Sequence, residues 1–199
     1  MARKARNVVL YDGCFAHVFS RALDQKLIFR SSDDFEFFKA LLQRTKNKYQ
    51  YRIHHYCLMN THFHLAVSMT ELKMFSDALK ELKQTYVKRV HEQNKKQKGP
   101  IWWGRFGSQV IEDERYLYAC GLYIEMNPVK AGMVKRPEDW PYSSSRHYFL
   151  NQTDPLIDPY EKPSDEPALK LSEKINFKRG NIIGSELFRL QTQECTYAT

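Results

Sequence analysis

Apolar residues in the first two thirds of the chain follow two spacings, one typical of strands and one typical of helices. Alternating or densely apolar runs predict strands over residues 15–21, 51–59, 62–69 and 106–111. Apolar positions repeated every three or four residues predict helices over residues 33–48, 71–97 and 114–127. The predicted order is therefore strand, helix, strand, strand, helix, strand, helix.

The first six of these elements match the split β-α-β arrangement. We therefore expect an α+β protein with a ferredoxin-like (RRM-like) β-α-β-β-α-β antiparallel sheet, helices on one face, and an added C-terminal helix that bears tyrosines. Asp113 is expected to open that last helix. Pro128 is expected to stop it, because the residue before a proline is pushed out of the helical region.

The composition changes near Pro137, where prolines and the run Ser143-Ser144-Ser145 become frequent. We therefore divide the chain into a domain at residues 1–136 and a Pro/Ser-rich C-terminal extension at residues 137–199, irregular and wrapped on the domain or partly loose. A short helix is expected near residues 185–193.

Bulk properties narrow the class of protein only moderately. The 199 residues, 42% of them hydrophobic, favour one domain with its own core. A formal charge of +8 favours an anionic partner. Four widely spaced cysteines without a CxxC pair argue against a zinc knuckle or a disulfide framework. We expect a cytosolic protein, because no segment has the character of a signal peptide or a membrane span.

The most informative short motif is His62-Phe63-His64, inside a predicted strand. Residues i and i+2 of a strand point to the same face, about 6.6 Å apart along the chain. Two neutral imidazoles on one face can hold a divalent metal. His17 and the pair His54-His55 are nearby competitors, but adjacent residues of a regular strand point to opposite faces.

Tyr123 and Asn127 form a second pair, on the last predicted helix. Four residues apart, their Cβ atoms lie about 5–6 Å from each other on one face. If that face meets the histidines, the Asn127 oxygen can be a third ligand and Tyr123 stands beside the metal. Tyr116 shares the face and is the rival nucleophile; Tyr123 is preferred because Asn127 lies one turn away.

These residue types suit attack by a phenol oxygen on a DNA phosphate. A phenol with a pKa of about 10 is almost wholly protonated at neutral pH, and a divalent cation polarises the phosphate that it attacks. Neutral ligands leave the full charge of Mg²⁺ or Mn²⁺ to the phosphate. The product would be a 5′-phosphotyrosine link and a free 3′ hydroxyl, so the strand could be rejoined elsewhere.

Several segments together resemble the REP-associated tyrosine transposases, which belong to the single-tyrosine HUH endonuclease and insertion-sequence transposase superfamily. The resemblance runs from about residue 7 to residue 150, and Asn60-Thr61 departs from the usual residues before the first histidine. The matching segments are His17–Arg21, Cys57–Leu65, Ile101–Ser108, Tyr123–Val134 and Asp139–Ser145.

The resemblance implies that residues 1–136 are a transposase catalytic domain with His62, His64 and Asn127 as metal ligands and Tyr123 as nucleophile. It also implies Mg²⁺ or Mn²⁺, a substrate of single-stranded or hairpin DNA of the REP type, and a monomer or homodimer. A bacterial cytoplasmic protein that acts at the nucleoid is expected.

DNA contacts are expected from basic residues near the predicted cut. Arg21 and Arg105 match family positions and could bind phosphates, although Arg105 could instead stack on Trp102 or Trp103. A basic N-terminal arm could reach the hairpin stem or guide bases, or be a solvated terminus. The basic residues of that arm are Arg3, Lys4 and Arg6. Two other functions stay open: a DNA-hairpin-binding regulator that does not cleave, and a zinc hydrolase acting on another substrate.

Overall fold

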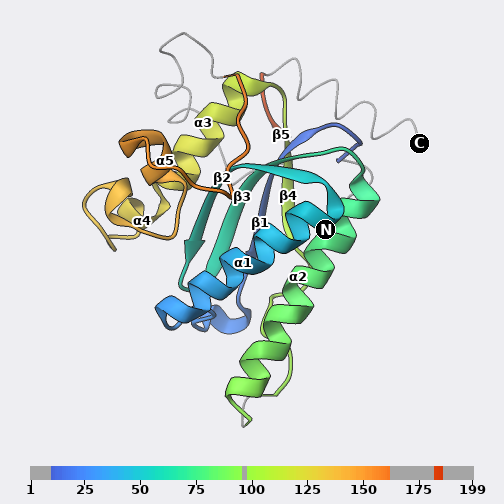
Figure 1. Cartoon of the computed structure of the whole chain (residues 1–199), viewed down its shortest axis with the longest axis vertical. Helices are drawn as coiled ribbons and strands as arrows, with labels where there is room; N and C mark the ends of the chain where they lie inside the picture. The colour runs from blue at the N-terminus through green and yellow to red at the C-terminus, as the bar shows by residue number, and fades with distance from the viewer. Residues whose placement is uncertain (1–9, 96–97, 162–181, 186–199) are drawn as a thin grey trace.

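The computed structural model describes residues 10–95, 98–161 and 182–185 of the chain (Figure 1). The strands are β1 Phe15–Arg21, β2 Tyr51–Met59, β3 His62–Met69, β4 Gly107–Ile111 and β5 Ile182–Ile183. The helices are α1 Ser32–Tyr49, α2 Leu72–Gln93, α3 Glu114–Glu125, α4 Asn127–Lys130 and α5 Ser145–Leu150. Single 3₁₀ turns lie at Leu23–Gln25 and Pro137–Asp139.

The sheet has the strand order β2-β3-β1-β4-β5. β1 pairs antiparallel with both β3 and β4, and β2 pairs antiparallel with β3. The predicted α+β class and antiparallel sheet are confirmed, and the first three strands have the predicted bounds. The short β5 was not expected; it pairs parallel with β4.

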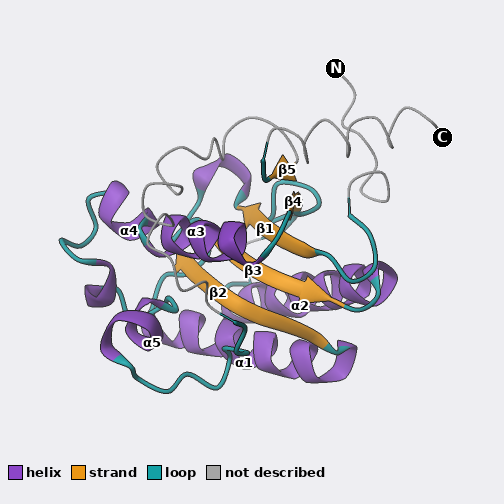
Figure 2. Ribbon diagram, turned by 90° about the horizontal axis from the view of Figure 1, so that it is seen from above, coloured by secondary structure: helices purple, strands orange, loops and turns teal. Residues whose placement is uncertain are grey.

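Helices cover both faces of the sheet, so the prediction of helices on one face is wrong for α3 (Figure 2). Side chains alternate between the faces along each strand. Val18 and Leu65 point to α1 and α2 in the larger core. Ala66 belongs to a second, smaller core, which packs against α3. β1 and β3 therefore pack on both faces, and the α3 face, which is only partly buried, carries His17 and His64.

His54 lies at a β-bulge in β2, where the register shifts between Ile53 and His55. The prediction that His54 and His55 point to opposite faces is wrong for this reason. The bulge sets two residues of β2 against one residue of β3. His54 lies 2.9 Å from Ser68 Oγ and His55 lies 2.9 Å from Glu125, both on the α3 side.

Two predicted helix ends also differ from the structure. α2 ends at Gln93 instead of residue 97, because Val90 is its last buried apolar residue and lysines follow. α3 ends at Glu125, and Pro128 does not stop helical structure. It lies in the first turn of α4, where the missing N–H of a proline costs little.

The described part of the C-terminal extension covers β2, a strand at the edge of the sheet. Leu58 N donates to Tyr142 O at 2.9 Å, and Ser144 N donates to Tyr56 O at 3.0 Å. These bonds pair backbone groups that an uncovered edge would leave to water. The helix predicted near 185–193 lies outside the described residues, apart from Ser185. The division at residues 136 and 137 stays a prediction.

Candidate active site

A cleft of about 350 Å³ opens where β1 ends and β3 begins. Three of the predicted site residues line it together: His62, His64 and Arg21. The remaining lining residues are Phe19, Ser20, Ala22, Gln25 and Thr61. The cleft is therefore the first place to look for the predicted chemistry.

His62 and His64 point into the same side of the sheet, as their spacing predicts. Their ring centroids are 5.0 Å apart and the rings are nearly perpendicular. His62 Nδ1 lies 2.9 Å from Thr61 Oγ1, and His64 Nδ1 lies 2.9 Å from His17 Nε2. Each ring thus has its Nδ1 engaged within the protein, which leaves both Nε2 atoms for a ligand.

Burial keeps these imidazoles in the neutral form that can bind a metal. Burial lowers the pKa of His62. The pKa of His64 is held well below its usual value by burial and by its neighbours His17 and His62. A neutral imidazole retains the lone pair that a cation needs, so the donor set suits a divalent metal at neutral pH.

A metal at the histidine pair would need a further ligand of another type. Within the described ranges, no group of three or more His, Cys, Asp or Glu side chains is arranged to hold a metal ion. Asn127 Nδ2 donates to Tyr123 O and to Ile124 O, both at 3.0 Å. These bonds anchor the amide nitrogen to the end of α3, so Oδ1 is the atom that remains for a ligand role.

The ring of Tyr123 packs edge-on against the histidines. Its centroid lies 6.3 Å from that of His17 and 6.5 Å from that of His64, at interplanar angles of 79° and 87°. Burial, with a smaller contribution from Cys120, raises the pKa of Tyr123. Lys130 Nζ lies 4.3 Å from the centre of the same ring. The helix tyrosine, the histidines and a cationic side chain thus meet in one region.

The sequence patterns do not predict a role for Lys130. It follows Tyr123 by seven residues, which is two helical turns, across Met126, the residue that separates α3 from α4. The feature of the sequence that could have indicated this contact is the seven-residue spacing of Lys130 from Tyr123 within the Tyr123–Val134 motif.

A buried polar network holds α3 against β2. His55 Nδ1 lies 2.9 Å from Glu125 Oε1, and Ser144 Oγ donates to the same oxygen at 2.6 Å. His55 Nε2 lies 2.8 Å from the Tyr160 hydroxyl. Gly121 allows the close approach, because a Cβ there would clash with the His55 ring. Glu125 is only two residues from Tyr123 on α3. By holding α3 against β2, the network therefore also positions Tyr123.

The predicted DNA-binding residues lie in different places. Arg21 lies over the ring of Trp103, 5.0 Å from its centre, and Trp103 is half exposed. The cation over the ring of Trp102 is Lys83. Stacking of Arg105 on Trp102 or Trp103 was the predicted alternative. In the structure the cations over these rings belong to Lys83 and Arg21. Arg3, Lys4 and Arg6 lie outside the described residues.

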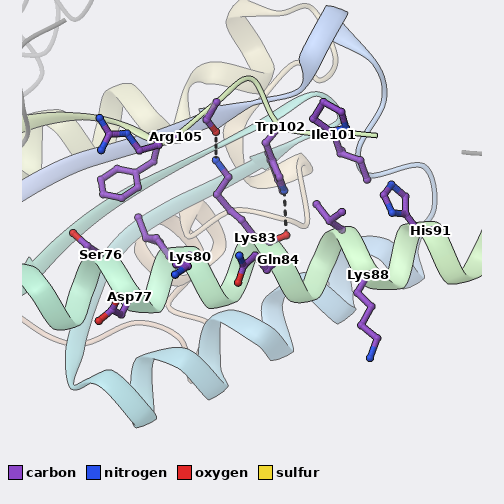
Figure 3. A pocket seen from close by; sticks show the side chains of 15 residues that line it. Ser76, Asp77, Lys80, Lys83, Gln84, Lys88, His91, Ile101, Trp102 and Arg105 are labelled. Atoms are coloured by element: carbon purple, nitrogen blue, oxygen red, sulfur yellow. Dashed lines mark hydrogen bonds between the residues drawn. The ribbon is translucent and has the colours of Figure 1, made fainter. Parts of the chain in front are cut away.

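Arg105 lines a second, larger groove, of about 810 Å³, between α2 and the loop before β4 (Figure 3). Its wall is apolar and its other cationic side chains come from α2. Lys83 Nζ donates to Gly104 O at 2.8 Å and to Ser20 Oγ at 2.9 Å, which ties α2 to the loop and to β1. The lining cations are Lys80, Lys83, Lys88 and Arg105.

Comparison with known proteins assigns the family. The family model described as "Transposase IS200 like" matches residues 11–127, more than half of the chain. The chain therefore belongs to the family of IS200-like transposases. Its match ends at Asn127 and includes His62, His64 and Tyr123. None of the described helices has the length and apolar character that a bilayer crossing needs.

Two of the proteins that are similar to this chain are a curated relative and a solved structure. A Haemophilus influenzae protein named as a REP-associated tyrosine transposase is 28% identical over 116 residues, 54% of this chain and 66% of that protein. The aligned part is thus just under two thirds of that relative. A REP-associated tyrosine transposase solved bound to a REP hairpin matches with a TM-score of 0.64 and 19% identity, over 83% of this chain and 95% of that chain. At this identity the likeness shows a shared fold.

Proposed function

We propose that this protein is a single-stranded DNA endonuclease and strand transferase that acts on hairpin DNA of the REP type and uses Tyr123 as nucleophile. The observation that carries the proposal is the packing of the Tyr123 ring against His64, one of two cleft histidines whose Nε2 atoms are available. The family assignment supports the reaction class, and the hairpin in the complex of the solved relative supports the substrate class.

A divalent cation, Mg²⁺ or Mn²⁺, would be held by Nε2 of His62 and of His64 together with Oδ1 of Asn127. When bound, it would polarise the scissile phosphate and stabilise the charge that develops during transfer. Two imidazoles and one amide add no negative charge of their own. Imidazole ligands favour Mn²⁺ over Mg²⁺ in intrinsic affinity.

The proposed step exchanges one phosphate ester for another. The Tyr123 oxygen attacks phosphorus, the bond from phosphorus to the 3′ oxygen breaks, and the phenolic proton is balanced by the proton that the leaving 3′ hydroxyl gains. Burial of Tyr123 opposes loss of its proton. Lys130 Nζ lies 4.3 Å from the centre of the same ring, where a positive charge would favour the phenolate, but burial lowers the pKa of Lys130 itself. Reversal by a different 3′ hydroxyl rejoins the strand without nucleotide hydrolysis.

Two cationic surfaces are proposed to hold the DNA. Arg21, in the cleft beside His62, would bind a phosphate next to the cut, and the exposed Trp103 beneath it would stack on an unpaired base. The groove that contains Arg105 would receive the backbone of the hairpin. Arg3, Lys4 and Arg6 would add further contacts with the DNA. We expect the protein to act in the bacterial cytoplasm at the nucleoid, as a monomer or homodimer.

The experiment is an adduct assay with Mn²⁺ and a labelled pool of hairpin oligonucleotides with randomised flanks. Wild-type protein should give a complex that survives denaturant, and Tyr123→Phe should give none while its hairpin binding stays close to wild type. Tyr116→Phe is the matched control on the same helix and should keep the adduct. Hairpin binding without any adduct in the wild type would favour the non-cleaving regulator instead.

A further inference from the structure

We infer that His17 and Gln109 are positioning residues that fix the tautomer of His64, so that its Nε2 lone pair is presented to the cleft. The inference rests on the proposed metal site and adds two residues to it. Neither residue lines the cleft, and the sequence pattern indicates His17 only as a competitor of the histidine pair.

Three neighbouring strands bring the three side chains together. His17 on β1 is paired in register with Gln109 on β4, and His64 on β3 lies diagonally opposite, paired with Phe19. His17 Nδ1 lies 2.9 Å from Gln109 Oε1, and His17 Nε2 lies 2.9 Å from His64 Nδ1. The rings of His17 and His64 are stacked at 5.1 Å. His17 and Gln109 are both buried.

The direction of each hydrogen bond follows from the amide oxygen. Gln109 Oε1 can only accept, so His17 Nδ1 carries a proton. A neutral imidazole has one N–H, which leaves His17 Nε2 as an acceptor. His64 Nδ1 must then donate, and the single proton of neutral His64 sits on Nδ1. The unprotonated nitrogen of His64 is therefore Nε2, the atom that a cation needs.

The opposite orientation of the Gln109 amide would reverse the direction of both hydrogen bonds that link Gln109, His17 and His64. A Gln109 NH₂ group would donate to His17 Nδ1, His17 Nε2–H would donate to His64 Nδ1, and His64 Nε2 would carry the proton. A protonated Nε2 cannot ligate a metal. Gln109 thus decides, two side chains away, whether His64 is ready to bind.

His62 lacks an equivalent arrangement. Its Nδ1 faces the hydroxyl of Thr61, and a hydroxyl can either donate or accept. The tautomer of His62 can therefore adjust when a cation binds, whereas that of His64 is set in advance by the relay. Partners behind a metal-binding histidine commonly act in this way, and their loss weakens metal affinity about 10–100-fold.

The test has two readouts, neither of which needs DNA. The first is long-range ¹⁵N–¹H NMR of the metal-free full chain, which distinguishes a protonated Nδ1 from a protonated Nε2 in His64. We expect protonated Nδ1 in the wild type and a mixture of tautomers in Gln109→Leu. A wild-type His64 protonated at Nε2, or a tautomer that is unchanged in Gln109→Leu, would overturn the inference.

The second readout is Mn²⁺ affinity, measured by the electron paramagnetic resonance signal of free Mn²⁺. His17→Phe keeps an aromatic ring but removes the acceptor, and its affinity should fall about 10–100-fold. His17→Gln can accept from His64 through its oxygen and donate to Gln109 through its nitrogen, so it should stay close to wild type. His54→Gln replaces a buried histidine on the same sheet face outside the relay and is the matched control.

The possible failures are distinguishable. Binding in the wild type that is lost in His62→Ala but unchanged in His17→Phe would overturn the relay and leave the proposed metal site intact. If the wild type shows no Mn²⁺ binding that His62→Ala removes, the metal site itself is overturned. The part of the inference that concerns metal then fails with it. The tautomer experiment would still decide whether Gln109 controls His64.

Discussion

The carboxylate of Glu125 lies 2.9 Å from Nδ1 of His55, and neither side chain is exposed to solvent. Glu125 is on α3 and His55 is on β2, so this contact ties the helix that carries Tyr123 to the sheet that carries the histidine pair. Ser144 and Tyr160 complete the network from the C-terminal extension. The extension thus helps to hold α3 on the sheet.

Replacing Glu125 with alanine should be strongly destabilising. It leaves His55 and Ser144 buried without their shared acceptor, which costs about 1–3 kcal/mol of unfolding free energy for each donor left unsatisfied. Denaturant unfolding measures the change. Glu114→Ala on the exposed first turn of α3 is the control and should cost less than about 1 kcal/mol. A Glu125 variant as stable as this control would contradict the role given to the network.

Replacing Gly121 with alanine should destabilise the protein through one specific clash. The new Cβ would meet the His55 ring, which Glu125 and Tyr160 hold in place. Overpacking of this kind costs about 1–3 kcal/mol. Removing the ring in a His55→Ala background should abolish most of that extra cost, so unfolding of the four proteins gives a double-mutant cycle. Additive effects would show that the clash is not the cause.

Spacings along the chain predict which side chains share a face of one strand or helix. They do not predict that α3 meets the strand that carries the histidines. Two-residue spacing was enough to set His62 and His64 on one face. Four-residue spacing places Tyr123 near Asn127, and the contact that the structure shows is from the Asn127 amide to the backbone carbonyl of Tyr123. Whether the two pairs meet depends on α3 lying on the second face of the sheet, which helical periodicity does not specify. Packing of α3 against β2 decides it, through Gly121 and Glu125.

The roles of His17 and Gln109 were missed because patterns along single strands do not show how the strands pair. His17 meets Gln109 and His64 only through the register of β1 with β4 and with β3. The bulge at His54 likewise arises from the pairing of β2 with β3, and a sequence-based strand pattern assumes regular alternation. The bounds of isolated strands were therefore predicted well, whereas contacts between strands were not.

The stability of the protein should fall as the pH is lowered from 6.5 toward 4. Burial lowers the pKa of His54 from its ordinary value to about 4. Between these values the unfolded chain binds more protons than the folded one, so the free energy of unfolding decreases as the pH falls. The full effect of one such histidine is about 3 kcal/mol.

His54→Gln should therefore flatten the dependence of unfolding free energy on pH in this window. His17, whose pKa burial also lowers to about 4, should preserve part of the slope in that variant. Denaturant unfolding at several pH values between 4 and 7 measures both curves. Equal slopes for the wild type and His54→Gln would show that His54 does not contribute to the acid sensitivity.

Arg21→Ala should weaken hairpin binding in a salt-dependent way. If Arg21 binds one phosphate, its loss should reduce the slope of log affinity against log salt by about one unit. Arg44 is the control, because it lies on α1 and pairs with Glu81 of α2. Fluorescence anisotropy of a labelled hairpin at several salt concentrations measures both variants. An unchanged slope in Arg21→Ala would remove Arg21 from the phosphate contacts.

The most direct test identifies the covalent link itself. Wild-type protein is incubated with Mn²⁺ and the hairpin pool, carrying a label at the 3′ end or at the 5′ end, and the adduct is digested and sequenced by mass spectrometry. We predict that the 3′-labelled fragment stays attached through its 5′ phosphate to Tyr123, while the 5′-labelled fragment is released with a free 3′ hydroxyl. Attachment at Tyr116, or release of both fragments without any protein-linked DNA, would contradict the account.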